Sequence, residues 1–517
     1  MRLFHWIFVI CLLNACQPKA SVDLNSLSHI PTSDAVGAAR MPDTIAAISA
    51  PFPTINLRKP TFPARSISIE DRGLKKGQLA TGLIQQAIDE LSASGGGKVI
   101  IPSGKWNTGR ISLKSNVNLY LSEGAKLYFS GEIKDYLPVV FTRNEGIELM
   151  SLGACIYANG QENIAVTGKG KLVGPAEGSV RERIMTHDVI ENVVALDKPV
   201  KERVYDGNNE GFIFPPMFIA PINCTNVLIE GISLERTAFW NIVPQYCDRV
   251  IIRGVTINSI GIPRGDGIDI ESSKNVLVEY CTLRTGDDCL AMKAGRGWDG
   301  LRVNKPTENV VVRYCLAEKG HGGITIGSET AGVIRNLYVH DCVFNNEGNG
   351  IRFKTRRPRG GGGEKLYYER IRMNVGETAL RWDMLGSAVH VGAAADRSTK
   401  IAVNKLTPHF KDIQIKDLII ENASQFVRID GIPESPLENV MIRNVQSNSE
   451  KLFEATDARN IQLTNALLKS KDDTLHGLNI KNIGFEGVQF DIPTKKILFD
   501  MPDVEDEHAI SLKNISY

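Results

Sequence analysis

Three aspartates lie in two short glycine-containing segments near the middle of the chain. Asp266 belongs to Arg264–Asp269, and Asp287 and Asp288 are adjacent in Thr285–Cys289. Neighbouring carboxyl groups raise one another's pKa, so a cluster of them keeps at least one protonated near neutral pH. Glycosidic cleavage needs a protonated acid for the leaving oxygen and an ionised base for water. These residues therefore predict glycoside hydrolysis, provided that the fold brings them together.

Three further side chains suit the same chemistry. His321, in Gly320–Gly323, could tune or reprotonate the acid, and Arg352 and Lys354 carry positive charge suited to a sugar carboxylate. An aspartate cluster could instead bind Ca²⁺. Because a histidine and two cations accompany the aspartates, we expect catalysis, with no metal and no cofactor.

A repeated phrase indicates the elements that must position these groups. A polar residue, usually Asn, precedes an alternating apolar triplet and a turn. Where no loops interrupt the repeat, successive copies begin 21 and 22 residues apart (439 to 460 and 460 to 482). A recurrent interval in the twenties, with two or three short strands each time, is typical of a β-solenoid, whereas a propeller blade needs about 40 to 50 residues. The phrase begins at Asn116, Asn163, Asn226, Arg249, Asn275, Asn309, Asn336, Asn439, Asn460 and Asn482.

The repeat makes two geometric predictions. Asparagines at one position of successive coils should stack into a side-chain hydrogen-bond ladder. The intervals Asn275 to Leu290, Asn309 to Ile324 and Asn336 to Ile351 are each 15 residues, so these coils share one register. With rungs about 4.8 Å apart, this register brings all the candidate site residues onto one outer face of four neighbouring coils. They are Asp266, Asp287, Asp288, His321, Arg352 and Lys354.

These segments resemble a known family. Thr285–Cys289, Gly320–Gly323 and Ile351–Lys354 are similar to the signature segments of the polygalacturonases, glycoside hydrolase family 28, and Arg264–Asp269 resembles that family's Asn-Thr-Asp-Gly segment. The resemblance spans roughly residues 60 to 500. It implies an all-β, single-stranded, right-handed parallel β-helix and hydrolysis of α-1,4-galacturonic acid linkages with inversion.

The resemblance also implies a role for each residue. Asp287 would be the general acid, while Asp266 and Asp288 would position and deprotonate the water. His321 would support the acid, and Arg352 with Lys354 would bind the galacturonate carboxylate. The usual Asn-Thr is here Arg264-Gly265, which leaves the preferred pectic polymer open, although the histidine segment favours galacturonic acid on both sides of the cut.

Two basic insertions border the predicted site. Residues 296 to 308 include Arg296 and Trp298, and residues 355 to 365 include Arg356. We interpret them as a mobile rim that binds a polyanion, with Trp298 as a sugar platform, although solvated surface loops would look the same. The loop at about 175 to 215 is also long, and a wall at one end of a groove would favour exo action. Trp240, Trp382, Tyr246 and His390 are weaker candidates, explained equally by packed or surface positions.

The ends of the predicted solenoid have their own signals. Residues 78 to 93 have helical apolar spacing followed by Gly95-Gly96-Gly97, which predicts a helix capping the N-terminal end. Residues 17–50 are small and polar and predict a flexible tether. We therefore expect a catalytic β-helix with its cap over residues 51–517.

Residues 1–16 predict export. A charged start and a short apolar run end in Leu13–Cys16, which resembles a lipobox with Cys16 as the acylated residue; Asn14 is unusual there, so a plain signal peptide is the alternative. We expect a periplasmic or outer-membrane location in a Gram-negative bacterium, with a lipid anchor as a membrane contact. The seven later cysteines are odd in number and lack metal-binding spacing, which favours buried thiols.

Composition narrows the partners. A formal net charge of +1 gives no global attraction for nucleic acid. The resemblance implies a pectic polysaccharide or oligogalacturonide as the partner, and we expect the protein to be a monomer. Three alternatives remain open: a β-helix polysaccharide lyase that uses Ca²⁺, a hydrolase of rhamnogalacturonan or branched pectin, and a noncatalytic binding solenoid.

Overall fold

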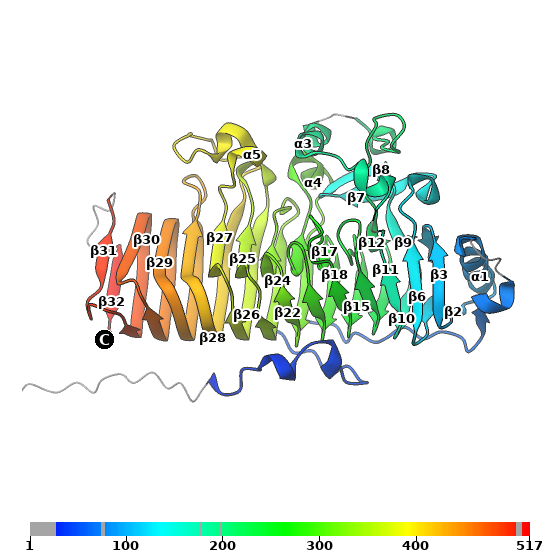
Figure 1. The fold of residues 1–517 in the computed structure, drawn as a ribbon. Helices are drawn as coiled ribbons and strands as arrows, with labels where there is room; N and C mark the ends of the chain where they lie inside the picture. Colours follow the sequence, from blue (N-terminus) through cyan, green and yellow to red (C-terminus); the bar gives the residue numbers. More distant parts are fainter. Residues whose placement is uncertain (1–26, 74–77, 176, 196–197, 503–508) are drawn as a thin grey trace, which may run out of the picture.

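The computed structural model describes residues 27–73, 78–175, 177–195, 198–502 and 509–517. Within them the chain winds into a parallel β-helix, with loops along one side and an extended N-terminal segment along the opposite side (Figure 1). Each coil supplies up to three short strands, which pair in parallel with those of the next coil. This confirms the predicted parallel β-helix. The predicted signal segment and Cys16 lie outside the described residues.

The paired strands form three strips along the β-helix, named here strips A, B and C. Strip A begins with β2 (Gly97–Ile101), β5 (Val117–Leu121), β10 (Glu162–Gly168), β13 (Thr225–Glu230), β15 (Asp248–Arg253), β18 (Lys274–Glu279) and β21 (Thr307–Arg313). Strip B begins with β3 (Gly104–Thr108), β6 (Ala125–Phe129), β11 (Lys171–Val173), β14 (Ser233–Glu235), β16 (Thr256–Asn258), β19 (Thr282–Arg284) and β22 (Leu316–Lys319). Strip C comprises β4 (Ile111–Ser112), β9 (Ala154–Asn159), β12 (Met217–Ile222), β17 (Ile268–Glu271), β20 (Leu290–Lys293), β23 (Gly322–Ile326), β25 (Asn349–Lys354) and β27 (Thr378–Asp383).

Toward the C-terminus the strands lengthen and bend across several strips. β24 (Ile334–Phe344) and β26 (Gly362–Asn374) each cover strips A and B, while β28 (His409–Asp430), β29 (Leu437–Ser470) and β30 (Thr474–Asp491) also enter strip C. The last strands are β31 (Leu498–Asp500) and β32 (Ile510–Lys513). Inward-facing residues of all strips form one continuous apolar core.

A helix covers the N-terminal end of this core. α1 (Thr81–Ala93) buries Ile84, Ala87, Ile88 and Leu91, and it packs beside β1 (Ser66–Ser68) and β2 (Figure 1). Without this cover the first coil would present unpaired edge groups and open apolar side chains. The predicted cap is confirmed, and it begins three residues later than its apolar spacing indicated.

The predicted asparagine ladder is present. Each of the ten phrase residues, from Asn116 to Asn482, has φ between 51° and 63°, a left-handed conformation that asparagine tolerates better than most residues. Side chains bond from coil to coil: Asn336 Nδ2 donates to Asn309 Oδ1 at 3.0 Å, and Asn482 Nδ2 donates to Asn460 Oδ1 at 2.8 Å. The repeat therefore marks a turn that places an amide in the same position on successive coils.

Residues 27–63 form an extended strap across the outside of strips A and B. Buried arginines bind its backbone: Arg253 Nη2 donates to the Pro42 oxygen at 2.6 Å, and Arg313 Nη2 donates to the Ala46 oxygen at 2.9 Å. Apolar strap residues, including Phe52, pack on outward-facing strand residues such as Leu277. Residues 27–50 thus differ from the expected flexible tether, because carbonyl groups and scattered apolar side chains bind a surface that the local sequence does not reveal.

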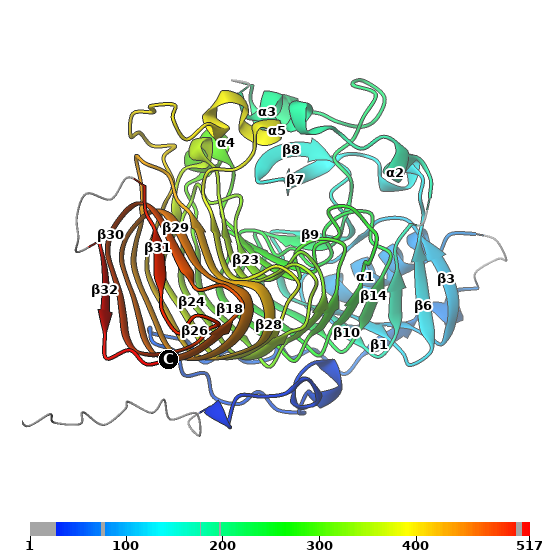
Figure 2. The same cartoon turned by 60° about the vertical axis from the view of Figure 1, so that its left-hand side comes forward.

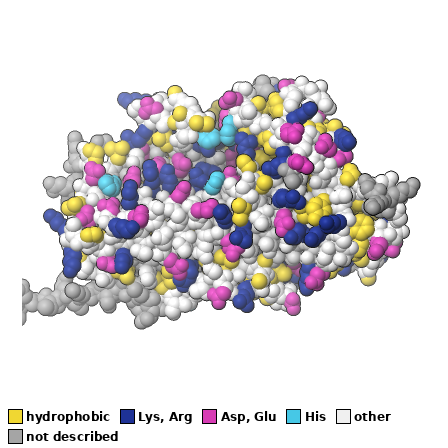
Figure 3. All heavy atoms as spheres, in the orientation of Figure 1, with side chains coloured by type: hydrophobic (Ala, Val, Ile, Leu, Met, Phe, Trp, Pro, Cys, Tyr) yellow, Lys and Arg dark blue, Asp and Glu magenta, His cyan; other side chains and the backbone are white. Residues whose placement is uncertain are grey.

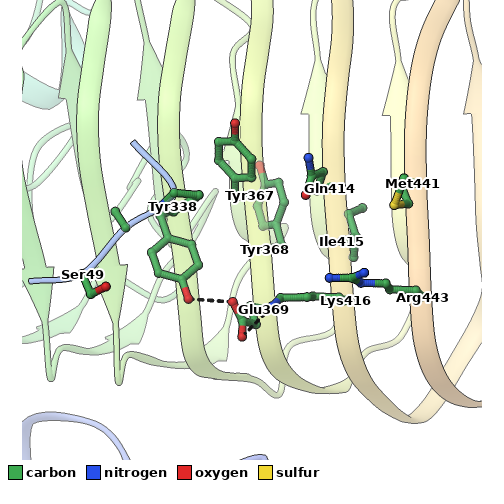
Figure 4. Close-up of a pocket in the computed structure, with 12 residues that line it drawn as sticks. Ser49, Tyr338, Tyr367, Tyr368, Glu369, Gln414, Ile415, Lys416, Met441 and Arg443 are labelled. Atoms are coloured by element: carbon green, nitrogen blue, oxygen red, sulfur yellow. Dashed lines mark hydrogen bonds and ion pairs between the residues drawn. The ribbon is translucent and has the colours of Figure 1, made fainter. Parts of the chain in front are cut away.

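A cavity of about 300 Å³ opens where the strap meets the tyrosines of β24 and β26 (Figure 4). Its carboxylate, Glu369, accepts a hydrogen bond from Tyr338 Oη at 2.7 Å and lies 2.9 Å from Lys416 Nζ. A single carboxylate that is already paired with Tyr338, Lys416 and Arg370 cannot supply both an acid and a base. This cavity is therefore not the predicted catalytic site.

Insertions on the opposite side build a roof over strip C. They contain the antiparallel hairpin β7 (Val140–Asn144) and β8 (Ile147–Ser151) and the helices α2 (Ser179–Glu182), α3 (His187–Ala195), α4 (Gly297–Val303) and α5 (Ala388–Val391). In Figure 2, α3 and α5 approach each other above the strands. Short 3₁₀ helices lie at Ser33–Ala35, Ala38–Arg40, Ile69–Arg72, Ile133–Tyr136, Val200–Glu202, Arg357–Arg359 and Gly392–Ala395.

The structure also bears on the state of the cysteines and on membrane-spanning helices. The seven cysteines among the described residues are all buried and unbonded, as the sequence indicated. In the described ranges, no helix is both long and apolar enough to cross a bilayer.

Candidate active site

A polar cavity of about 290 Å³ lies between strip C and the roof. Figure 3 shows the corresponding recess between two raised loop regions, where basic, acidic and histidine side chains gather. Its floor includes Asp266, Asp287, Lys293, Arg352 and Lys354, and its walls include Glu145, His187, Arg264, Arg296 and His390.

The register predicted from the repeat is the observed one. Ile268 pairs with Leu290, Leu290 with Ile324, and Ile324 with Ile351. As a result, one carboxylate oxygen from each of Asp266, Asp287 and Asp288 lies within 4.8 Å of the others. The structure thus brings together three residues that are up to 22 positions apart in the sequence.

Asp288 is fully buried, and cations surround it. Lys354 Nζ lies 2.9 Å from Asp288 Oδ2, Arg352 Nη1 lies 3.7 Å from Oδ1, and Thr325 Oγ1 donates to Oδ1 at 2.8 Å. Burial alone would raise the pKa of this carboxyl, but Lys354 and Arg352 outweigh burial and hold the pKa below its ordinary value. These contacts therefore favour the ionised form of Asp288.

The absence of a side chain at Gly322 makes room for Asp288. A Cβ atom built at Gly322 would lie 3.0 Å from Asp288 Oδ1 and 2.5 Å from Thr325 Oγ1. Any larger residue would displace the hydroxyl that binds the carboxylate. The glycine beside His321 is thus a requirement of the site's packing.

Asp266 has the opposite electrostatic environment. It is 3% exposed, and its pKa is raised well above the ordinary value, first by burial and then by the nearby Asp269 and Asp287. Lys293 opposes this shift without cancelling it. Environments that push the pKa values of neighbouring carboxyl groups apart are the usual basis of acid and base roles in one site.

Asp287 faces the cavity and contacts His321. Its side chain is 26% exposed, and His321 Nδ1 lies 3.3 Å from Asp287 Oδ1. The hydrogen bond with Asp287 raises the pKa of His321 above its ordinary value, although partial burial opposes the shift. Asp287 is the most accessible of the three aspartates and can reach an entering substrate.

A buried lysine below the cluster was not singled out from the sequence. Lys293 Nζ lies 3.2 Å from Glu329 Oε2 and 3.7 Å from both Asp266 Oδ2 and Asp269 Oδ1, and it sits over the Trp240 ring at 4.4 Å. Burial tends to lower the pKa of Lys293, but these carboxylates raise it well above the ordinary value. Lys293 therefore supplies a permanent charge under Asp266.

Arg264 joins the floor to a wall at one end of the cavity. Its Nε lies 3.3 Å from Glu145 Oε1 on the β7–β8 turn, and its Nη2 lies 3.3 Å from His187 Nε2 at the start of α3. The His187 ring meets the His390 ring edge to face, with centroids 4.7 Å apart. Two separate insertions thus meet above the aspartates.

Two of the three predicted rim residues differ from expectation. Arg296 is 3% exposed and is not mobile, because its guanidinium contacts Glu145 at 2.7 Å, Glu329 at 2.9 Å and Glu191 at 3.1 Å. Trp298 is 57% exposed and lies outside the residues that line the cavity. Arg356 does line the cavity, and its buried Nε and Nη1 have no hydrogen-bond partner within the described part of the chain.

Several wall residues were missed because their sequence signal is weak. Glu145 lies on the β7–β8 turn and His187 begins α3, both in insertions outside the repeat, and Glu329 follows β23 in a segment that contains two glycines. Lys293 ends β20 directly after three apolar residues, a position that equally suits an exposed lysine at the end of a strand. Trp240 and His390, the weaker sequence candidates, do line the cavity, whereas Trp382 is fully buried against Phe353.

The three clustered carboxylates could also hold a cation by distance alone. The charges around them favour another use, because Lys354, Arg352 and Lys293 already lie within 3.7 Å of Asp288 or Asp266. A parallel β-helix with an ionised carboxylate, a carboxyl group of raised pKa and a neighbouring histidine in one cleft belongs to the class of carbohydrate-cleaving β-helix enzymes.

Comparison with known proteins finds one family. Residues 206–379 match the model of Glycosyl hydrolases family 28, and the chain is polygalacturonase-like. It is 29% identical over 396 residues to a probable polygalacturonase of Vitis vinifera (74% of each chain) and 25% identical over 384 residues to an endo-polygalacturonase of Pectobacterium carotovorum (72% of this chain, 86% of the other). The exopolygalacturonase structure from Thermotoga maritima aligns with a TM-score of 0.59 and 27% identity, covering 89% of this chain and 94% of the other.

Proposed function

We propose that this enzyme hydrolyses α-1,4-galacturonic acid linkages of pectin and oligogalacturonides, removing units from a chain end with inversion. The observation that supports this substrate best is the pair of cations beside the catalytic cluster. Arg352 and Lys354 project from β25 into the cavity that Asp287 faces. A guanidinium and an ammonium one pleat apart fit a sugar that carries a carboxylate.

In the proposed mechanism Asp287 is the general acid. It gives its proton to the glycosidic oxygen as the bond to the anomeric carbon breaks. Asp288, held ionised by Lys354 and Arg352, takes a proton from the attacking water, and Asp266 positions that water. His321, bonded to Asp287, supports the acid and participates in its reprotonation.

The stereochemical outcome is inferred from the family resemblance rather than from the spacing of the carboxyl groups. Inverting glycosidases usually separate their two carboxyl groups by about 6.5–9.5 Å to admit water, whereas oxygens of the three aspartates here approach within 4.8 Å. Asp266 and Asp288 are both available beside Asp287 to activate the attacking water. Proton NMR of the first product decides the point: an α linkage cleaved with inversion yields β-anomeric product first, and an initial α-anomer would contradict it.

The proposed exo mode is supported by the asymmetry of the cavity. On the side of the earlier coils, Arg264, Glu145 and His187 join floor and roof into a wall. On the side of the later coils, the cavity continues into a second groove past Arg352 and Arg356. A substrate that enters from the open side and stops at the wall would present only its terminal linkage to Asp287.

Digestion of polygalacturonate and of oligogalacturonides of defined length tests the proposal. We expect monomer as the main early product, with reducing ends accumulating well before viscosity falls. An early viscosity collapse with mixed oligomers would mean endo cleavage. An unsaturated, ultraviolet-absorbing product suppressed by a chelator would mean a lyase, and activity on rhamnogalacturonan alone would change the substrate.

We also propose that the protein is exported to the periplasm or outer membrane of a Gram-negative bacterium, with Cys16 lipidated. This rests on residues 1–16, which the structure does not describe. Membrane fractionation of the wild type and Cys16→Ser tests it: the variant should leave the membrane fraction, and equal fractionation would remove the anchor.

A further inference from the structure

A second groove of about 530 Å³ continues from the catalytic cavity toward the later coils. Arg352, Arg356 and His390 line both spaces, so the two are contiguous. Among the described residues, those lining the groove include five arginines and two aspartates, Asp383 and Asp430. The groove is therefore strongly basic in a protein whose net charge is close to zero.

Three of these arginines occupy one outward position on successive coils of strip C. Arg352 on β25 pairs in register with Arg381 on β27, and Arg381 pairs with Arg428 on β28. Successive rungs are about 4.8 Å apart, so the guanidinium groups follow a line that starts beside Asp288. We call these three residues the arginine ladder.

The arginine ladder is only partly neutralised by the protein. Asp430 serves both Arg381 and Arg428, with Arg428 Nε 3.2 Å from Asp430 Oδ2. Arg352 lies 3.7 Å from Asp288, a carboxylate that it shares with Lys354. Stacked like charges that share their counter-ions destabilise the free protein, and an added anion would relieve this repulsion.

Arg356 marks the junction of the two spaces and has unused donors. Its Nε and Nη1 are buried without a hydrogen-bond partner in the described ranges. Burial and the nearby Arg296 lower the pKa of Arg356, with Glu329 partly opposing them. Buried donors of this kind are normally satisfied by protein, water or a ligand, and a guanidinium fork fits a planar carboxylate.

We propose that the arginine ladder, with Arg356, binds successive uronate carboxylates of the substrate beyond the one held at Arg352 and Lys354. This inference rests on the proposed function, because it assumes a substrate that carries a carboxylate on each sugar. A regular line of guanidinium groups matches a regular line of carboxylates better than it matches a neutral glycan. The wall at Arg264 leaves this groove as the exit for the rest of the polymer. The arginine ladder therefore makes the enzyme prefer longer oligouronides over the dimer.

The test compares KM for di-, tri-, tetra- and pentagalacturonide in the wild type and in R428Q. The Arg428 side chain is 43% exposed, so its loss should not disturb folding. We expect KM for the tetramer and pentamer to rise about tenfold in R428Q, with digalacturonide kinetics and thermal stability unchanged. R459Q is the matched control, since Arg459 is also half-exposed but pairs with Glu438 outside both cavities.

Binding measured without turnover separates this inference from the proposed function. Calorimetry on Asp287→Asn with pentagalacturonate and with neutral maltopentaose should show binding of the uronide alone, weakened about tenfold by adding R428Q. Failure of the wild type to cleave galacturonides would remove the proposed function while this binding result still decided the groove. Equal pentagalacturonate affinity with and without Arg428, or an equal KM change at every chain length, would overturn the arginine ladder as a binding site.

Discussion

The central and C-terminal coils have the same parallel β-helix backbone, but their charged side chains differ in solvent exposure. In the C-terminal coils the repeat is 21 or 22 residues, and ion pairs such as Lys471–Glu450 keep both side chains more than half exposed. In the central coils the repeat lengthens to 27 and 34 residues, and the Lys293–Glu329 pair is only 4% and 3% exposed.

The inserted residues account for the difference. They build the roof that removes water from strip C, and interactions between charges strengthen where water is excluded. Exposed pairs at the C-terminus, in contrast, contribute little to stability because solvent screens them. The comparison teaches that the solenoid supplies register, whereas the insertions turn one stretch of it into a site with perturbed carboxyl groups.

Replacing the proposed acid should give the largest difference in activity between the central and C-terminal coils. Asp287→Asn removes the proton donor and should lower kcat on oligogalacturonides by about 10²-fold or more, with little change in thermal stability because the side chain is partly exposed. Glu454→Gln, a strip C carboxylate of the C-terminal coils that pairs in register with Arg428, is the control and should leave kcat unchanged. Retained activity in Asp287→Asn would remove this residue from the acid role.

The next largest effect should be on the free energy of unfolding, when the buried Lys293 is replaced. Lys293→Met leaves Asp269 buried without its cation and removes one of the two cations that pair with Glu329, so it should lower the free energy of unfolding by about 3 kcal/mol. Lys481→Met, at an exposed position of the C-terminal coils, should change it by less than about 0.5 kcal/mol. Denaturant titration measures both, and equal effects would contradict the proposed difference between the two regions.

The asparagine ladder spans both regions and should respond alike in each. Asn460→Ala removes one amide bond to Asn439 and one from Asn482 and should cost about 1–2 kcal/mol of unfolding free energy. Asn309→Ala removes the matching bonds to Asn275 and from Asn336. Similar losses without any change in KM would show that the turn belongs to the scaffold; a loss of activity in only one variant would argue otherwise.

The smallest expected effect is on pH dependence. The hydrogen bond with Asp287 raises the pKa of His321, so the charged imidazole persists to higher pH than in an unfolded chain and is lost as pH rises through the raised pKa. Its contribution to stability is complete below the unfolded pKa of about 6.5 and disappears above the raised value. We expect kcat/KM of the wild type to fall on this alkaline limb and His321→Gln to lack the limb; an unchanged profile would assign it to another group.

The sequence predicted the positions of residues in the repeated coils, but it did not predict the contacts of residues in the inserted loops. The Asn intervals gave the register that joins Asp266, Asp287 and Asp288, because side chains at one offset of a parallel β-helix must stack. Arg296 was misjudged as mobile because its partners Glu145 and Glu329 lie 151 residues before and 33 residues after it. Lys293 was passed over because burial beneath a loop leaves no local pattern. Contacts between side chains of different loops depend on the finished fold, and the spacing of residues in the sequence does not predict them.

The strap has a consequence for the order in which the molecule assembles. Arg372 donates to the carbonyl oxygens of Pro31 and Ile30, across 341 and 342 positions of the chain. Coils can form one after another from neighbouring residues, but this part of the strap has no docking surface until β26 exists. The strap is synthesised early but can dock only after β26 has been synthesised and has folded. Contacts of such long sequence separation form slowly. Removing residues 27–50 should spare the formation of individual coils while abolishing this final clamping step.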